Sequence, residues 1–264
     1  MVDLKVGAAF DPTLLARIED ACLNASAPPQ QRWLDGWLVR YSPGKAKRAR
    51  SINAVAAGRL PVAEKLRLAE PVFREARLEL VVRLTPFSQP QDLDEILAAI
   101  GMLAFDDTRV MVASTLKNLP QLALPAGCVV EPTDHQQFAQ AVGHLRRSPQ
   151  THRVAHAQRL ISSPVPYQGW LVRKGADVVA CAQVAMEADM VGIYDVFTAP
   201  SVRGEGIAKS LCAQVLQHAV AQGARLGYLQ VDSANTAARA VYSQLGFSDA
   251  YSYHYRAANP AAAA

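Results

Sequence analysis

The stretch from Val196 to Leu211 constrains the fold more than any other part of the sequence. A β-branched and aromatic run breaks at Pro200, passes Gly204 and Gly206, and enters a helix rich in alanine and leucine. The first N–H groups of a helix have no partner within it, and the helix dipole favours negative charge there. Glycine lets the backbone approach a phosphate without a Cβ in between. The stretch therefore predicts a strand, an anion-binding loop and a helix, against the alternative of a plain strand-to-helix turn.

A second motif follows, after a predicted strand at 226–231. Residues 235–247 have the pattern of a short helix that ends at a glycine, with Asn235 at its start and Tyr242 inside it. The sequence Arg-Gly-Glu-Gly-Ile-Ala at 203–208 is similar to the acyl-CoA signature of the GNAT acetyltransferase superfamily. The pattern of 235–247 resembles the second motif of that superfamily. Both motifs in this order, with a helix and a strand between them, are much more specific than either alone.

Composition narrows the class of protein. The chain has 264 residues, of which 50% are hydrophobic and 19% charged, so we expect a soluble globular protein of two domains. No apolar run approaches the ~20 residues that span a bilayer, and the N-terminus lacks the layout of a signal peptide. Four scattered cysteines indicate reduced thiols and a cytoplasmic location. The net charge of +4 gives little support to nucleic-acid binding.

The order of predicted elements repeats along the chain. In the first half we expect a helix at 11–25, strands at 33–41 and 51–56, a helix at 62–77 that Pro71 should kink or split, a strand at 78–84, a helix at 90–100 and a strand at 108–116. Residues 118–127 are the predicted linker. In the second half we expect helices at 136–147 and 152–161, strands at 167–173, 178–186 and 190–198, a long helix to about 222, a strand at 226–231, a helix at 235–245 and a last strand near 251–255.

Residue identities repeat as well. The sequence Gly-Trp-Leu-Val-Arg at 36–40 recurs at 169–173, and Ile-Gly-Met at 100–102 stands where Leu-Gly-Phe stands at 245–247. At matching places in two similar element orders, this recurrence predicts a duplication. The second copy has about a dozen extra residues between the two anchors, and they include the glycine loop. We therefore predict two related domains, of which only the second kept the loop.

The whole chain resembles the tandem GNAT proteins, whose N-terminal domain has degenerated. The resemblance implies a mixed α/β (α+β) fold of two GNAT-like domains, each a twisted, mostly antiparallel sheet flanked by helices. We expect residues 1–120 to form the degenerate domain and residues 127–256 to form the acetyl-CoA-binding acetyltransferase domain.

The resemblance also implies how acetyl-CoA is held. Backbone N–H groups of the glycine loop bind the pyrophosphate, and the preceding strand bonds the pantetheine arm through its main chain. Asn235 contacts CoA or serves only as a helix N-cap. The cofactor-binding residues that we predict are Val196, Phe197, Thr198, Arg203, Gly204, Glu205, Gly206, Ile207, Ala208, Asn235 and Tyr242.

Two residues are candidates for catalysis. Tyr242 holds the place of the tyrosine that many family members use as a general acid toward the CoA thiolate; the alternative is a core tyrosine that packs beside Phe247. Asp195 lies within an apolar strand, where an acid has either a partner or a task. It is our candidate base, although pairing with an arginine is the stronger alternative. An amine of low pKa needs no base.

These residues predict direct transfer of acetyl from acetyl-CoA to an amine on a small molecule or peptide, by an N-acetyltransferase that acts as a monomer or homodimer without nucleic acid, membrane or metal. No cysteine lies in either motif to carry the acetyl group. The main alternative is a non-catalytic acyl-CoA-binding regulatory module; others are a different acyl donor and a hydroxyl acceptor. The basic cluster Lys45–Arg50 has three alternative interpretations: a solvated loop, a site that attracts an anionic substrate, or part of the domain interface. The acceptor, the oligomeric state and the role of the N-terminal domain stay open.

Overall fold

The structure is a computed structural model that describes residues 10–44 and 46–263. The elements of the N-terminal half are α1 (Pro12–Ala25), β1 (Gln31–Leu34), β2 (Trp37–Arg40), the 3-10 turn η1 (Lys47–Ala49), β3 (Ile52–Asn53), α2 (Val62–Glu75), β4 (Val81–Leu84), α3 (Leu93–Ala99) and β5 (Leu103–Ala113). The elements of the C-terminal half are β6 (Cys128–Thr133), α4 (His135–Leu145), α5 (Gln150–Ile161), β7 (Tyr167–Lys174), β8 (Asp177–Glu187), β9 (Met190–Thr198), η2 (Pro200–Val202), α6 (Ile207–Ala221), β10 (Leu226–Asp232), α7 (Thr236–Ser243) and β11 (Ser248–Ala257).

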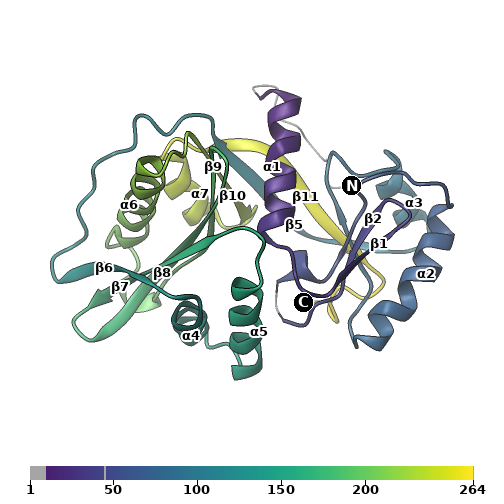
Figure 1. Cartoon of the computed structure of the whole chain (residues 1–264), viewed down its shortest axis with the longest axis horizontal. Helices are drawn as coiled ribbons and strands as arrows, with labels where there is room; N and C mark the ends of the chain where they lie inside the picture. Colours follow the sequence, from purple (N-terminus) through teal and green to yellow (C-terminus); the bar gives the residue numbers. More distant parts are fainter. Residues whose placement is uncertain (1–9, 45, 264) are drawn as a thin grey trace.

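The described strands form one sheet in the order β1-β2-β3-β4-β11-β5-β10-β9-β8-β7-β6. Neighbours are antiparallel except for two parallel pairs, β3 with β4 and β9 with β10. Figure 1 shows the two halves on either side of the central strands β5 and β11. The mixed α/β class and the mostly antiparallel sheet predicted from the sequence are confirmed.

The two halves exchange their last strands. β5 ends the N-terminal half but pairs with β10, and β11 ends the C-terminal half but pairs with β4. The two exchanged strands also pair with each other. Counted outward from this centre, the two sides of the sheet correspond strand by strand: β11 to β5, β4 to β10, β3 to β9 and β2 to β8. The parallel pair of each side, β3 with β4 and β9 with β10, falls at the same position. The boundary at 118–127 stays a prediction, but a fragment that ended at residue 120 would lose β11 from beside β4.

This topology corrects one argument for duplication. Residues 36–40 lie in a turn and in β2, whereas residues 169–173 lie in β7. Because β2 matches β8 in the strand order, the two copies of the five-residue sequence do not occupy equivalent places. The other pair does correspond: Gly101 and Gly246 each follow the last helix of their half, with φ of 88° and 91°. The strand order, and not the letter-for-letter repeat, supports a duplication.

Several predicted boundaries differ from the structure. The single strand expected at 33–41 is wrong, because Asp35 and Gly36 have φ of 43° and 84° and turn the chain into a hairpin of β1 and β2. Helix α2 contains Pro71 and is not split there. Strand β5 begins at Leu103, five residues before the predicted start at 108. By contrast, β9 has the predicted bounds.

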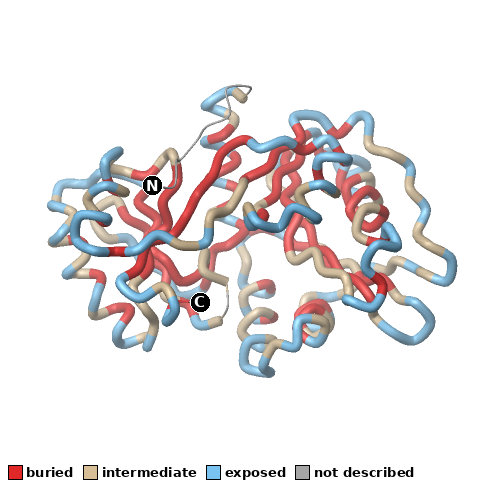
Figure 2. The backbone as a smooth tube through the Cα atoms, turned by 180° about the vertical axis from the view of Figure 1, so that it is seen from behind, coloured by how far each residue is buried: buried red, intermediate tan, exposed pale blue. Residues whose placement is uncertain are grey.

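Three hydrophobic clusters hold the helices on the sheet. One face is shared by both halves and packs against α1, α4 and α5. On the other face, α2 and α3 cover the N-terminal half and α6 and α7 cover the C-terminal half. Alternating side chains in one strand divide between the faces: Tyr228 packs in the shared cluster and Leu229 in the cluster under α6. Figure 2 shows the buried backbone concentrated in the central strands.

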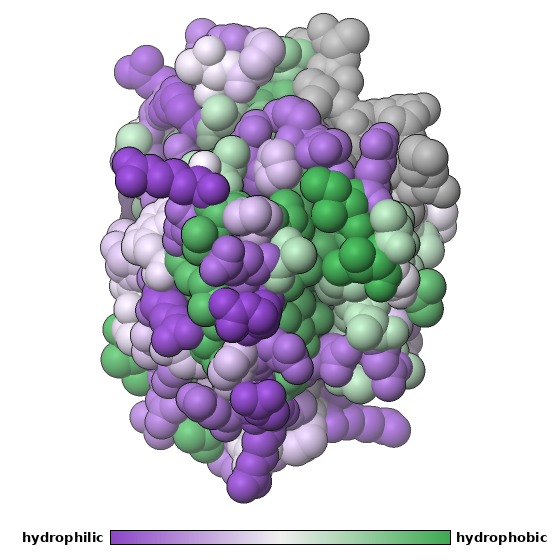
Figure 3. Space-filling view, turned by 90° about the vertical axis from the view of Figure 1, so that its right-hand side faces the viewer, coloured by the Kyte–Doolittle hydropathy of each residue, from purple (hydrophilic) through white to green (hydrophobic). Residues whose placement is uncertain are grey.

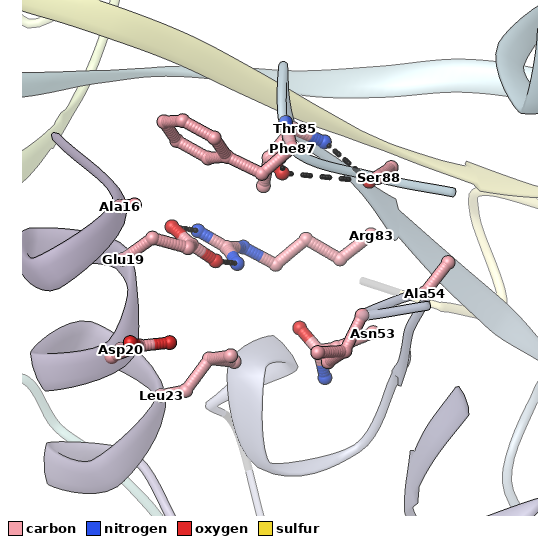
Figure 4. A pocket seen from close by; sticks show the side chains of 11 residues that line it. Ala16, Glu19, Asp20, Leu23, Asn53, Ala54, Arg83, Thr85, Phe87 and Ser88 are labelled. Carbon is pink, nitrogen blue, oxygen red and sulfur yellow. Dashed lines mark hydrogen bonds and ion pairs between the residues drawn. The ribbon is translucent and has the colours of Figure 1, made fainter. Parts of the chain in front are cut away.

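A buried ion pair ties α1 to β4, and a tyrosine of the exchanged strand β11 bonds to it. Both guanidinium Nη atoms of Arg83 in β4 donate to the carboxylate of Glu19 in α1 (Figure 4). The hydroxyl of Tyr251 in β11 donates to the same carboxylate at 2.7 Å. Arg83 is 2% exposed and Glu19 7% exposed, so the pair is shielded from water. Removing either charge would leave the other buried and unpaired, which is strongly destabilising.

The predicted linker lies along α6. Side chains of that helix bond to its main chain: Ser210 Oγ to the Ala123 carbonyl at 2.9 Å and Gln217 Nε2 to the Pro120 carbonyl at 2.8 Å. Figure 3 shows the end of the molecule formed by the N-terminal half, where hydrophobic side chains are surrounded by hydrophilic ones. No helix within the described residues has the length and apolar character needed to cross a membrane.

Candidate active site

A cleft opens where two parallel strands separate. β9 pairs with β10 only from Met190 to Ile193, while β10 continues along β5 as far as Asp232. Beyond Ile193 the edge of β9 that faces β10 therefore has no strand partner among the described residues. The cleft has a volume of about 780 Å³ and is lined by the end of β9, the glycine loop, β10 and α7. It exposes main-chain donors and acceptors to an extended ligand.

A β-bulge lies at the point where the strands separate. Phe197 pairs with Cys181 and Tyr194 pairs with Gln183, so Asp195 and Val196 stand opposite one residue of β8. Asp195 has φ of 51°, a left-handed conformation that aspartate tolerates better than most residues. Bulges interrupt pairing and redirect side chains, and they are frequent beside active sites. No feature of the sequence predicted this one.

The glycine loop forms the outer end of the cleft. Gly204 and Gly206 have φ of 84° and 82°, and apart from the adjacent residues no atom of the described residues lies within 4 Å of a Cβ built on either. Gly206 is the N-cap of α6 and provides no side-chain cap, so the first N–H groups of the helix stay available. Because both glycines need a left-handed backbone and border open space, the loop can accommodate a phosphate.

The structure brings together nearly all of the predicted cofactor residues. The cleft is lined by Val196, Phe197, Thr198, Arg203, Gly204, Gly206, Ile207, Ala208, Asn235 and Tyr242. The exception is Glu205, whose carboxylate pairs with Lys174 Nζ at 2.9 Å outside the cleft. Asn235 caps α7, since its Oδ1 accepts from the Ala238 N–H at 3.1 Å. The Thr198 hydroxyl is buried with no hydrogen-bond partner among the described residues, so a ligand in the cleft could bond to it.

Tyr242 lies on α7 at the inner part of the cleft. It is 8% exposed and its ring packs edge-on against Phe247, with centroids 6.3 Å apart. Its hydroxyl makes no hydrogen bond to the residues that the structure describes. Burial raises the pKa of Tyr242 above the ordinary 10.0, so the phenol carries its proton at neutral pH. The geometry is compatible with both predicted roles, a proton donor to a ligand and a core aromatic.

Asp195 accepts hydrogen bonds from Arg146 and Gln183, and the His156 imidazole lies within ion-pair distance. Arg146 Nη1 lies 2.8 Å from Oδ1, while Gln183 Nε2 and His156 Nε2 lie 2.6 Å and 3.3 Å from Oδ2. Burial alone would raise the pKa of Asp195, but Arg146 and then His156 hold it well below the ordinary 3.8. A carboxylate that is paired with an arginine and has a lowered pKa is a poor base near neutral pH. This environment favours the arginine-pairing alternative over the catalytic one.

Sequence reasoning missed three side chains that reach the site. Arg146 is the C-cap residue of α4, and its guanidinium lies 5.7 Å from the centre of the Phe197 ring. Gln230 lies in β10 and also lines the cleft. Arg48 comes from the N-terminal half, and its guanidinium bonds to Gln230. The basic cluster at 45–50 was noticed, but only the tertiary fold shows that Arg48 enters the cleft; Lys45 lies outside the described residues.

Comparisons with known proteins agree with this geometry. Residues 136–247 match the acetyltransferase (GNAT) family, and they include the bulged strand, the glycine loop and α7. No curated protein matches the chain.

Solved structures resemble the chain over most of its length. It is similar to a GCN5-related N-acetyltransferase from Kribbella flavida, with a TM-score of 0.66 and 18% identity over 92% of this chain and 94% of that one. It is also similar to a functionally unknown protein from Staphylococcus epidermidis, with a TM-score of 0.63 and 13% identity over 86% of this chain and 93% of that one. Its similarity to a tandem GNAT protein from the clavulanic acid biosynthesis pathway has a TM-score of 0.58, with 15% identity over 75% of this chain and 70% of that one. Such identities show a shared fold and no more; the sequence match is what supports a GNAT family domain at residues 136–247.

Proposed function

We propose that the protein is an N-acetyltransferase that binds acetyl-CoA in the cleft between β9 and β10 and transfers acetyl directly to an amine. One observation carries the proposal: a single cleft joins an open glycine loop at a helix N-terminus to a buried phenol with a free hydroxyl. The available N–H groups at the start of α6 suit the pyrophosphate, and the unpaired edge of β9 from Val196 to Thr198 suits the pantetheine arm. Acetyl-CoA supplies the activated acetyl group.

Each remaining step of the proposed reaction is assigned to particular residues of the chain. Tyr242 is the proposed general acid that gives its proton to the departing thiolate. Main-chain N–H groups at the bulge polarise the thioester carbonyl. Asp195 is assigned a positioning role, because it fixes Arg146 beside Phe197. The incoming amine reacts in its neutral form and needs no protein base.

We also propose that the N-terminal half has lost cofactor binding, because its own carboxylate occupies the equivalent loop. The loop before α2 corresponds to the glycine loop before α6 in the strand order. There, Asp35 accepts hydrogen bonds from the N–H groups of Arg59 and Leu60 at 2.8 Å and pairs with Lys65 Nζ at 3.2 Å. An internal anion thus takes the place that a phosphate would need. The buried free thiols of Cys22, Cys181 and Cys212 fit a cytoplasmic location.

A turnover screen tests the proposed reaction. Acetyl-CoA is offered with representative amines of several classes, and the release of free CoA thiol is followed with the matched hydroxyl compounds as controls. Transfer to at least one amine, with the acetylated product seen by mass spectrometry, is the expected result. Tight acetyl-CoA binding without transfer to any amine would instead favour the non-catalytic binding module.

A further inference from the structure

A second cavity meets the cleft where β9 and β10 separate. It has a volume of about 260 Å³ and lies between the turn after β2, in the N-terminal half, and helices α4 and α5. Arg48, Arg146 and Asp195 line both this cavity and the cleft. Because α4 and α5 pack on the opposite face of the sheet from α6 and α7, the cavity reaches the end of the cleft from the other side. A small molecule in it would meet a thioester in the cleft.

The second cavity is strongly cationic. Four guanidinium groups line it, those of Arg48, Arg146, Arg153 and Arg159, against the one carboxylate of Asp195. That carboxylate is already paired with Arg146 at 2.8 Å, so its charge does not neutralise the other three arginines. A cavity with this balance attracts an anion and disfavours an amine that carries only positive charge.

Arg48 is the cation at the junction, and its contacts are with neutral groups. Its Nη1 bonds to Gln230 Oε1 and lies 3.2 Å from the Tyr253 hydroxyl, and its guanidinium lies 5.8 Å from the Tyr194 ring centroid. No carboxylate of residues 10–44 or 46–263 lies within 4.0 Å of it. Arg48 Nε and Gln230 Nε2 are both buried donors without a partner in that part of the chain. Buried donors without a partner, and a half-buried cation without a counter-ion, cost free energy that an anionic ligand would recover.

The cofactor phosphates are not that anion. The glycine loop follows Thr198, and Arg48 stacks on Tyr194, four residues earlier in β9. Four residues of strand span about 13 Å. The phosphate end and the Arg48 end of the site are therefore well separated, and Arg48 lies at the end where the acceptor must enter.

We propose that the acceptor is an amine that also carries a carboxylate or phosphate group, and that Arg48 of the N-terminal half binds this anionic group. The inference rests on the proposed acetyl transfer for the identity of the ligand as an acceptor. A guanidinium can donate two parallel hydrogen bonds to either group, which fixes orientation as well as charge. The N-terminal half then supplies acceptor selection, while the C-terminal half supplies the cofactor site.

The test measures binding separately from turnover. The full chain is saturated with CoA, so that no transfer occurs, and titrated by calorimetry with matched probes: leucine against leucinamide, and phosphoethanolamine against ethanolamine. In at least one pair the anionic member is expected to bind 10-fold or more tightly than the neutral one. Arg48→Gln should lower the affinity of that anionic member about 10- to 100-fold, the loss expected for a charge-assisted hydrogen bond, and leave the neutral member within about 3-fold. Arg48→Lys should restore part of the loss.

Lys47→Gln is the matched control. It removes the same charge from the same turn, but Lys47 pairs with Asp106 at 2.8 Å and lines neither cavity. It should leave all four affinities unchanged. Equal binding of both members of each pair by the wild type, or binding of none of the probes, would overturn the inference; the wild-type comparison holds even if the Arg48 variants fold poorly. An equal loss for charged and neutral probes would also overturn it. Bound anionic probes that are never acetylated would count against the transfer and not against this anion site.

Discussion

Replacing Tyr242 by phenylalanine separates the proposed general acid from a core tyrosine. The variant keeps the ring and its packing on Phe247 and removes only a hydroxyl that bonds to no described residue. Because no protein hydrogen bond is lost, the free energy of unfolding should change by less than about 0.5 kcal/mol, or about 2 °C in Tm. General acid catalysis contributes roughly 10²–10⁴ in rate, so kcat should fall by that factor, equivalent to about 3–5 kcal/mol of barrier.

The assay is thiol release under saturating acetyl-CoA and amine, with rapid mixing to confirm that the chemical step limits the rate. Affinity for acetyl-CoA should stay within a few fold. Tyr251→Phe is the control, since that hydroxyl donates to Glu19 at 2.7 Å and neither residue lines the cleft; it should lose stability and keep its turnover. The raised pKa of Tyr242 means that its ionisation should not lower kcat up to pH 10. Full activity of Tyr242→Phe with chemistry rate-limiting would refute the assignment.

Three further predictions follow from particular contacts. Gly206→Val puts a β-branched residue at φ of 82°, so calorimetry should show acetyl-CoA binding weakened about tenfold or more. Gly223→Val is the control: it has the same strain, at φ of 105° after the other end of α6, and should cost stability but leave acetyl-CoA binding unchanged. Since the folded-state pKa of Asp195 is lowered, its stabilisation is present above about pH 4 and lost as the pH falls through the folded value. The stability gap between wild type and Asp195→Asn in urea should therefore narrow below pH 3.8, and a constant gap would contradict the ion pair. Glu19→Gln should cost about 3–5 kcal/mol because it leaves a buried guanidinium unpaired, and the exposed neighbour Asp20→Asn should cost little.

Local patterns predicted most of the elements and most of the residues that line the cleft, whereas features that depend on tertiary contacts were not predicted. The glycine loop and its helix were predictable because a left-handed backbone and free helix N–H groups are properties of adjacent residues. The bulge at Asp195 depends on pairing with β8, and the exchange of β5 and β11 depends on contacts between distant segments. Arg48 enters the cleft only because the two halves share one sheet. The five-residue repeat misled for the same reason, since identical letters occupy different strands.

The stoichiometry of acetyl-CoA binding tests the central claim most directly. Calorimetric titration of the full chain should give one site per chain, because the glycine loop before α6 is open and the matching loop before α2 is filled by the Asp35 carboxylate. CoA should compete for the same site. No binding would contradict the cofactor cleft, and two sites per chain would contradict the assignment of cofactor binding to the C-terminal half alone.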